Sequence, residues 1–226
     1  MLKHIPADRK EQLVAEAALL PTSDARVTYP SWYLHRWHFL PDGYLSRSSA
    51  ALYDHVVRRV YYQGLERTVT RAVLDRLEAL QPKSLLEVGC GAGRLLSRIA
   101  QREAITDIVG IDLSPYLLER AARRLRGRRV RLVHADGMHV PADEGAFDAV
   151  IASHYVGHLP ATLRSGAVAE LVRVVRPGGH VLVLDHRWHP SPASVHVREL
   201  PHSSRDVGAA RLRVLERLVE PSSERM

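Results

Sequence analysis

The sequence is poor in cysteine and in lysine. Its 226 residues include a single cysteine, Cys90, so no disulfide can form within the chain, and this suits a reducing compartment. Lysine occurs only at positions 3, 10 and 83, and arginine supplies almost all the positive charge of a chain whose formal net charge is +7. We interpret this preference for arginine as a habit of composition, of the kind that a GC-rich coding sequence produces.

Long apolar runs are also absent. No stretch approaches the roughly 20 consecutive apolar residues that a membrane-spanning helix needs. Residues 1–11 lack the apolar core of a signal peptide. These two absences predict a cytoplasmic protein that makes no contact with a membrane.

The positive charge is densest in residues 120–131, where seven of twelve residues are arginine. Such a run can bind an anionic partner such as RNA. It also coincides with the end of a predicted helix, where cations suit the negative end of the helix dipole. We favour the second interpretation and expect no nucleic-acid partner.

The most informative stretch is Leu85–Leu96, in which an apolar run ends at Glu87 and three alternating glycines follow, Gly89, Gly91 and Gly93. A strand, a tight turn and a helix N-terminus are predicted, because glycine lets a ligand lie directly against the backbone. The spacing differs from the dinucleotide fingerprint G-x-G-x-x-G. An acid before the first glycine would repel a pyrophosphate and could pair with an ammonium group.

With these residues in view, the stretch resembles the first signature motif of class I S-adenosylmethionine-dependent methyltransferases, and the resemblance extends over about Leu85–Leu184. It implies that Glu87 anchors the methionine end of S-adenosylmethionine, that Asp112 binds the ribose hydroxyls, and that Asp136 and Met138 contact the adenine. Asp112 could instead cap the next helix, and Asp136-Gly137 could be an ordinary turn. Cys90 is interpreted as a small residue beside the ligand rather than a reactive thiol. The full set of expected cofactor contacts is Glu87, Gly89, Cys90, Gly91, Gly93, Asp112, Leu113, Asp136, Gly137, Met138, Ser153 and Tyr53.

From Ser84 onward, predicted strands alternate with predicted helices, which is typical of a mostly parallel sheet with helices on both faces. We therefore expect an α/β, Rossmann-like, doubly wound fold, with ligands at the carboxyl ends of the strands. The expected strands are 84–88, 108–112, about 130–134, 146–152 and 180–184, and the expected helices are about 93–102, 114 onward and 160–175, the last ending at Pro177-Gly178-Gly179.

The N-terminal part is predicted to be helical, at residues 7–20, about 46–62 and about 65–80. Between the first two helices, six of the sixteen residues in Tyr29–Tyr44 are aromatic. This aromatic belt could be packed structure, a dimer surface or part of an acceptor pocket. We divide the chain into a lid, residues 1–82, and a cofactor-binding core, residues 83–226.

Histidines follow two of the predicted strands and could act as a general base, because imidazole titrates near neutrality. We rank His158 and His154 first and His186 third. The spacings of His154 with His158 and of His186 with His189 would also suit two pairs of metal ligands. No carboxylate or further cysteine is evident nearby, so we expect no metal.

The C-terminus departs from the family pattern, which adds a helix and two strands after strand 5. Residues 187–204 are rich in Pro, Ser and His, and residues 211–220 can supply one strand or a short helix. A shortened sheet edge is expected. An exposed edge invites pairing with another chain, which suggests a homodimer.

Three functions fit the sequence. The leading one is methyl transfer to an oxygen, nitrogen or carbon atom of a small aromatic or polyketide-like metabolite. The positive charge suggests an RNA or protein methyltransferase as an alternative. The third is an S-adenosylmethionine-binding protein or cyclase that performs no methyl transfer.

Overall fold

The fold is built on one eight-stranded sheet. A computed structural model describes residues 4–57, 65–185, 197–199, 205–207 and 210–218. The strand order is β3-β2-β1-β4-β5-β8-β6, with β7 also paired to β8, and the first five strands are parallel. The strands are β1 (Ser84–Val88), β2 (Asp107–Asp112), β3 (Arg131–His134), β4 (Phe147–Ser153), β5 (Val175–Asp185), β6 (Val197–Glu199), β7 (Arg205–Val207) and β8 (Ala210–Arg217).

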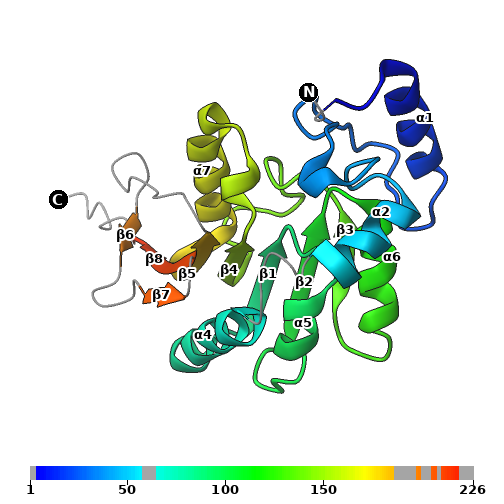
Figure 1. The fold of residues 1–226 in the computed structure, drawn as a ribbon. Coiled ribbons are helices and arrows are strands. Elements are labelled where there is room, and N and C mark those ends of the chain that lie inside the picture. The colour runs from blue at the N-terminus through cyan, green and yellow to red at the C-terminus, as the bar shows by residue number, and fades with distance from the viewer. Residues whose placement is uncertain (1–3, 58–64, 186–196, 200–204, 208–209, 219–226) are drawn as a thin grey trace.

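Helices cover both faces of this sheet (Figure 1). On one face pack α4 (Leu65–Leu80), α5 (Arg94–Ile99) and α6 (Pro115–Arg124), and on the other packs α7 (Arg164–Val174). Adjacent strand residues serve opposite faces, as Leu85 and Leu86 of β1 do, because side chains alternate along a strand. The predicted doubly wound α/β fold is confirmed. No helix within the described ranges is both long and apolar enough to cross a bilayer.

The N-terminal segment lies over the carboxyl end of the sheet. It consists of α1 (Ala7–Ala18), η1 (Trp37–Phe39), α2 (Arg47–Leu52) and a single π-helical turn, η2 (Tyr53–Val57). The predicted helix at 46–62 is therefore shorter in its described part, and residues 58–62 lie outside the described residues. The segment is fastened to the start of α6: the Ser114 hydroxyl donates to the Tyr44 carbonyl at 2.6 Å, and the Thr22 hydroxyl donates to the Pro115 carbonyl at 2.8 Å.

Helix α4 was expected within the lid, but it packs as part of the core. Its buried side chains Val69, Val73 and Leu77 lie in the same apolar cluster as Leu85 of β1 and Ile151 of β4. The helical period of the sequence is the same for a lid helix and a core helix, so periodicity could not distinguish them. The division of the chain at residue 82 stays a prediction.

Pro177-Gly178-Gly179 was expected as the turn before the fifth strand, and this prediction was wrong. These residues lie inside β5, which begins at Val175, and the β4–β5 register shifts between Phe147 and Ala149. Gly178 takes φ = 72°, and a methyl group at Gly179 would lie 2.7 Å from the Asp148 carbonyl oxygen. The glycines therefore permit a bulge in a continuing strand instead of ending it.

The C-terminal edge is more complete than the sequence suggested. Strand β8 is antiparallel to β5 on one side and pairs with the three-residue strands β6 and β7 on the other. The long uncovered edge on which we based a homodimer is therefore not present at β8. The oligomeric state stays a prediction.

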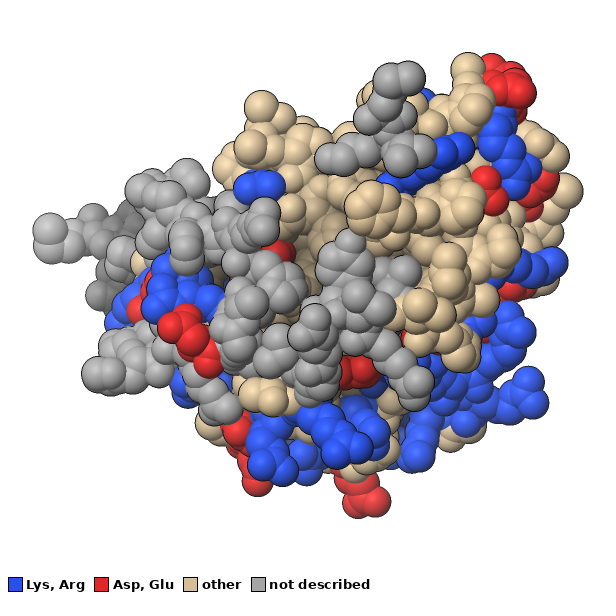
Figure 2. Space-filling model, viewed as in Figure 1, with Lys and Arg blue, Asp and Glu red and all other residues tan. Residues whose placement is uncertain are grey.

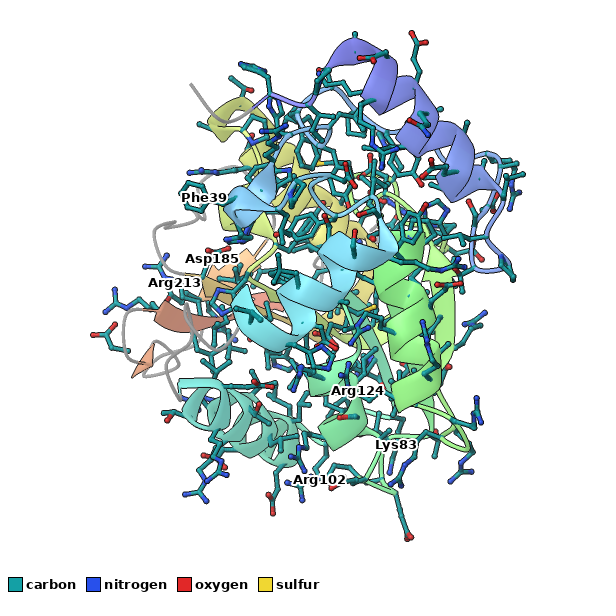
Figure 3. The ribbon with its side chains drawn as sticks, turned by 45° about the vertical axis from the view of Figure 1, so that its right-hand side comes forward. Phe39, Lys83, Arg102, Arg124, Asp185 and Arg213 are labelled. Atoms are coloured by element: carbon teal, nitrogen blue, oxygen red, sulfur yellow. The ribbon has the colours of Figure 1, made fainter. Side chains whose placement is uncertain are left out.

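One group of exposed basic residues gathers around the amino-terminal ends of the strands, at the bottom of Figure 2. Arg131 is the first residue of β3, Lys83 precedes β1, and Arg102 follows α5. Figure 3 shows Lys83 and Arg102 at the lower end of the molecule, far from Phe39 and Asp185. Of the basic run at residues 120–131, Arg131 lies at this end of the sheet, whereas Arg120 and Arg124 reach the N-terminal segment and bind Asp54.

One buried carboxylate joins this segment to the core. Asp54 of η2 is 1% exposed and accepts hydrogen bonds from Arg94 of α5 at 2.7 Å, from Arg120 of α6 at 3.0 Å and from Arg124 of α6 at 2.9 Å. Arg124 lies below α2 in Figure 3. Burial alone would raise the pKa of Asp54, but the hydrogen bonds and charges of Arg124 and Arg94 outweigh it and hold the pKa well below its usual range.

We predict that Asp54→Asn lowers the free energy of unfolding by about 3–5 kcal/mol, because three guanidinium groups lose their shared counter-ion. The wild-type contribution is present above the unfolded pKa of an aspartate and is lost as the pH falls through the depressed folded pKa. Urea denaturation at pH 7 measures the loss. Asp107→Asn, at an exposed carboxylate, is the control and should change stability by less than about 0.5 kcal/mol.

Candidate functional site

The described residues enclose a pocket where the carboxyl ends of β1, β2, β3 and β4 meet the N-terminal segment. Adjacent parallel strands end at one edge, so the loops that follow them converge. The lining contains ten of the twelve expected cofactor contacts: Tyr53, Glu87, Gly89, Cys90, Gly91, Asp112, Leu113, Asp136, Gly137 and Ser153. The other two, Gly93 and Met138, lie outside it.

The glycine turn after β1 is held by the end of β2. The backbone N–H groups of Gly89 and Cys90 both donate to the Ile111 carbonyl at 2.9 Å. Gly89 and Gly91 take φ values of 71° and 54°, which only glycine adopts freely, and a methyl group at Gly91 would meet no atom within 4 Å. The backbone at Gly91 is thus open to a ligand.

Gly93 has a different role from the one we expected. A methyl group there would lie 3.0 Å from the Ala121 side chain and 3.0 Å from that of Leu125, at φ = 71°. The third glycine therefore allows the start of α5 to approach α6. The spacing of three glycines could not distinguish contact with a ligand from contact between helices.

Asp112 connects the two loops on either side of it. It is 9% exposed, and its two carboxylate oxygens accept from Gly91 N and from Ser114 N, each at 2.8 Å. Burial raises the pKa of Asp112 to about 6, although these backbone hydrogen bonds oppose the shift. The cap of α6 is Ser114, whose hydroxyl oxygen accepts from Leu117 N, so Asp112 is not needed as the cap.

Asp136 lies in the lining but also forms a turn. Its Oδ1 accepts from Met138 N at 2.9 Å, which turns the chain away and leaves Met138 outside the lining. Asp136-Gly137 was predicted either to contact the adenine or to form an ordinary turn. The pair does form a turn, and this turn also presents Asp136 and Gly137 to the pocket.

Glu87 and Cys90 lie at the base of the pocket. Glu87 is 3% exposed and Cys90 is 6% exposed. Burial raises the pKa of the Cys90 thiol well above its usual value, and the negative charges of Asp112 and Glu87 add to this shift. These surroundings agree with a small residue beside a ligand and oppose a reactive thiolate.

Tyr155 was absent from the predicted site and is part of the pocket lining. Its ring packs beside Gly89, and its hydroxyl oxygen would be 2.8 Å from a methyl group at Gly137. The hydroxyl is buried and has no hydrogen-bond partner among the described residues, and burial raises the pKa of Tyr155. Its position after β4, two residues beyond Ser153, was the only signal in the sequence.

The opposite side of the pocket is aromatic. Four residues of the predicted belt line it, Trp32, Tyr33, Trp37 and Tyr44, together with Tyr53 of η2. Helix residues that the sequence did not single out complete this side, and they are Glu66, Val69, Thr70, Arg94 and Leu95.

Two of the three candidate base histidines line the pocket. His154 has φ = 55°, and its backbone N–H donates to the Leu184 carbonyl at 2.7 Å. His158 lies one turn further along the chain and also lines the pocket. His186 and His189 lie outside the described residues. No three histidine, cysteine, aspartate or glutamate side chains in the described part of the chain come together as metal ligands.

Comparison with known proteins gives a consistent result. Residues 86–183 match a family model described as a methyltransferase domain. The chain is 33% identical over 146 residues to a demethylmenaquinone methyltransferase of Thermus thermophilus, covering 64% of this chain and 65% of that protein. It is 34% identical over 139 residues to a 27-O-demethylrifamycin SV methyltransferase of Amycolatopsis mediterranei, covering 58% of this chain and 50% of that protein. The chain thus spans less than two thirds of either relative.

The fold also occurs in solved structures. A Burkholderia thailandensis 1,6-didemethyltoxoflavin-N1-methyltransferase, bound to 1,6-didemethyltoxoflavin and S-adenosylhomocysteine, superposes with a TM-score of 0.60 at 16% identity. The match covers 88% of this chain and 95% of that one. The N-methyltransferase NodS of Bradyrhizobium japonicum gives 0.56 at 18% identity, over 69% of this chain and 97% of that one.

We predict that Cys90 resists thiol reagents in the native protein, because burial and the two nearby carboxylates disfavour the thiolate. Reaction with a chromogenic disulfide at pH 8 should be at least ~10-fold slower in buffer than in denaturant. Since Cys90 is the only cysteine, the signal reports this position alone. Equal rates in the two conditions would show that the pocket base is open to solvent.

Proposed function

We propose that this chain, which belongs to the class I S-adenosylmethionine-dependent methyltransferases through residues 86–183, transfers a methyl group to a small aromatic or polyketide-like acceptor. The observation that carries the proposal is the pocket itself. On one side it has two buried carboxylates and an open glycine turn, and on the other it has a wall of tryptophan and tyrosine.

The residues of the first side fit S-adenosylmethionine. Glu87 is an acid at the base, suited to an ammonium group, and Arg94 is a cation that suits a carboxylate. Asp112 keeps acceptor capacity for ribose hydroxyls because each carboxylate oxygen accepts only one backbone N–H. The buried Tyr155 hydroxyl next to Gly137 offers a hydrogen bond to the adenine ring of the cofactor.

The cofactor, when bound, supplies an electrophilic methyl group on a sulfonium. The protein then has to hold the acceptor in line with that methyl group, exclude water and take up a proton where the acceptor atom carries one. The aromatic wall excludes water and binds flat rings. His158 is our first candidate for the base and His154 the second, because both reach the pocket from the loop after β4.

The nature of the acceptor is supported by two separate features. The aromatic wall is formed by four side chains of the belt and by Tyr53, which favours an apolar ring system. The names of the two relatives point to a demethylated menaquinone and a demethylated rifamycin as their acceptors. We extend this class, and not these compounds, to the present chain, with an oxygen, nitrogen or carbon atom as the methyl acceptor.

A nucleic-acid or protein acceptor is the weaker alternative. One group of exposed basic residues, which includes Lys83, Arg102 and Arg131, lies at the amino ends of the strands, whereas the pocket lies at the carboxyl ends. A polyanion bound by those arginines would be at the wrong end of the sheet to reach the methyl group. A protein that binds S-adenosylmethionine without transferring its methyl group is the other alternative, which product analysis distinguishes.

We predict that calorimetric titration shows one site for S-adenosylhomocysteine per chain. Incubation with S-adenosylmethionine and a panel of hydroxyquinones, phenols and polyketide aglycones should yield a product heavier by one methylene unit in mass spectrometry. Absence of binding would refute the proposal. Binding with no methylation of any panel member would favour the non-methylating alternative, and methylation of bulk RNA or protein would favour the other.

We further predict that the affinity for S-adenosylhomocysteine depends on the charge of Asp112. The ionised form accepts the ribose hydroxyls, so affinity is highest well above pH 6 and decreases as the pH falls through about 6. Asp112→Asn should weaken binding about 10- to 100-fold at pH 7, the loss expected for a hydrogen bond to a charged group. It should also flatten the pH dependence between 5 and 7. Asp107→Asn, at the other end of the same strand, is the matched control and should bind as the wild type does.

A further inference from the structure

A buried histidine joins the N-terminal segment to the core behind the pocket wall. His134, the last residue of β3, is 5% exposed and is not part of the pocket lining. Its Nδ1 atom accepts a hydrogen bond from the backbone N–H of Asp24 at 2.9 Å. Its Nε2 atom lies 3.1 Å from the carbonyl oxygen of Leu113, which follows β2 and lines the pocket. One imidazole thus connects three separate parts of the chain.

The two backbone partners fix the position of the ring proton. A backbone N–H can only donate and a carbonyl oxygen can only accept, so Nδ1 of His134 carries the lone pair and Nε2 carries the hydrogen. The Tyr29 hydroxyl lies 3.3 Å from Nε2 and can share that hydrogen, because a hydroxyl oxygen also accepts. These contacts require the neutral ring. A proton added at Nδ1 would face the Asp24 N–H, which is itself a donor.

Asp24 lies in a short strap, residues 22–28, which runs from α1 towards the aromatic belt. The strap is also bound through the Thr22 hydroxyl, which donates to the Pro115 carbonyl. Tyr29 directly follows the strap and stacks on Tyr33, with the ring centres 6.0 Å apart, and Tyr33 lines the pocket. A shift of the strap would therefore displace a ring of the aromatic wall.

We propose that His134 is a proton-sensitive clasp, which holds the strap closed beside the pocket while its ring is neutral and releases it when the ring is protonated. Release is local, because the Asp54 ion cluster and the hydrogen bond from Ser114 to Tyr44 do not involve His134. The inference rests on the proposed function in one respect: opening the strap speeds exchange of the cofactor. It adds to that function a control of access to the site.

Burial favours the neutral ring. It lowers the pKa of His134 below the ordinary value of 6.5, although the Leu113 carbonyl and the Asp24 carboxylate oppose the shift. When the strap opens, solvent reaches the ring and its pKa returns towards the ordinary value. The closed form is therefore favoured above pH 6.5, and it loses this advantage as the pH falls from there through the lowered pKa of the closed form.

The charged groups around His134 leave this preference in place. Asp24 is the carboxylate whose charge acts on the ring, and the Arg26 guanidinium binds both of its oxygens, with the shortest contact at 2.6 Å. Asp112 is opposite His134 in the β2–β3 register, but both of its oxygens accept from backbone N–H groups. The ionisable groups on the elements around the ring are Asp24 and Arg26 of the strap, Tyr29 of the belt, Asp112 of β2 and Tyr116 of α6.

The first experiment needs neither cofactor nor acceptor. NMR of the 15N-labelled wild-type protein gives the tautomer of His134 and the protection of the Asp24 amide against hydrogen exchange, expressed at each pH relative to an unstructured peptide. We expect the Nε2–H tautomer at pH 7.5. As the pH is lowered from 7 towards 5, protection of the Asp24 amide should fall together with protonation of the His134 ring.

Two results in the wild type would overturn the proposal. One is the Nδ1–H tautomer, because the Asp24 N–H would then have no acceptor on the ring. The other is protection of the Asp24 amide that stays constant until the protein unfolds in acid, whether or not the His134 ring takes up a proton.

Two substitutions separate the two bonds of the ring. In His134→Asn the side-chain oxygen can occupy the place of Nδ1 and keep the Asp24 bond, whereas in His134→Gln the amide nitrogen can occupy the place of Nε2 and keep the Leu113 bond. At pH 7.5, protection of the Asp24 amide should be about 3- to 10-fold lower in His134→Gln than in His134→Asn, the effect of one neutral hydrogen bond. Both variants should lose the pH dependence of protection, because neither amide titrates.

The two variants lack the same imidazole, so the loss of ring packing is matched between them. Both retain Asp112, so a pH dependence that persists in both would come from another group and overturn the clasp. Equal protection of the Asp24 amide in the two variants would do the same. His180 of β5 is another histidine whose pKa is lowered by burial, and His180→Asn is the control that should keep the wild-type pH dependence.

Release of S-adenosylhomocysteine connects the clasp to the site. At pH 7.5, displacement of radiolabelled ligand by an excess of unlabelled ligand should be about 3- to 10-fold faster from His134→Gln than from His134→Asn. Equal rates would overturn the control of access. A wild-type protein that binds no S-adenosylhomocysteine would count against the proposed function and not against the clasp, which the exchange measurements test without ligand.

Discussion

The structure depends on the buried ion cluster at Asp54. Burying one carboxylate costs several kcal/mol unless partners offset it, and here three guanidinium groups from α5 and α6 do so. The carboxylate belongs to the N-terminal segment and the guanidiniums to the core, so the cluster forms only when the two are joined. Tyr53, the residue before it, is thereby fixed in the pocket wall, and Arg94 is held at the start of α5.

The second constraint is the common edge of parallel strands. Asp112 at the end of β2 accepts the Gly91 N–H from the loop after β1 and the Ser114 N–H from its own loop, so one side chain sets the relation of two loops. The Ser114 hydroxyl in turn donates to the Tyr44 carbonyl, and Tyr44 is part of the aromatic wall. The polar groups that hold the carboxylate side of the pocket therefore also hold its aromatic side, so a substitution on one side would also displace the other.

These constraints give the pocket two chemically distinct sides within one enclosure. The carboxylates of Glu87 and Asp112 and the open backbone at Gly91 suit a charged nucleoside, and the aromatic wall suits an apolar acceptor. The Nε2 atoms of His38 and His158 lie 3.2 Å apart where the aromatic side of the pocket meets the loop after β4.

The sequence by itself determined the parallel α/β core, because strand and helix periods alternate from Ser84 onward, and it placed Glu87, Gly89, Gly91 and Asp112 at one edge. Local pattern decides such features. The sequence could not place α4 in the core, because a lid helix and a core helix have the same hydrophobic period. It also could not place Pro177–Gly179 inside β5, because the same residue types occur in a bulge and in a turn. The packing role of Gly93, the place of Tyr155 in the pocket lining and the contact of His38 with His158 are decided by tertiary structure alone, because each joins residues whose separation in sequence carries no information about their distance in space.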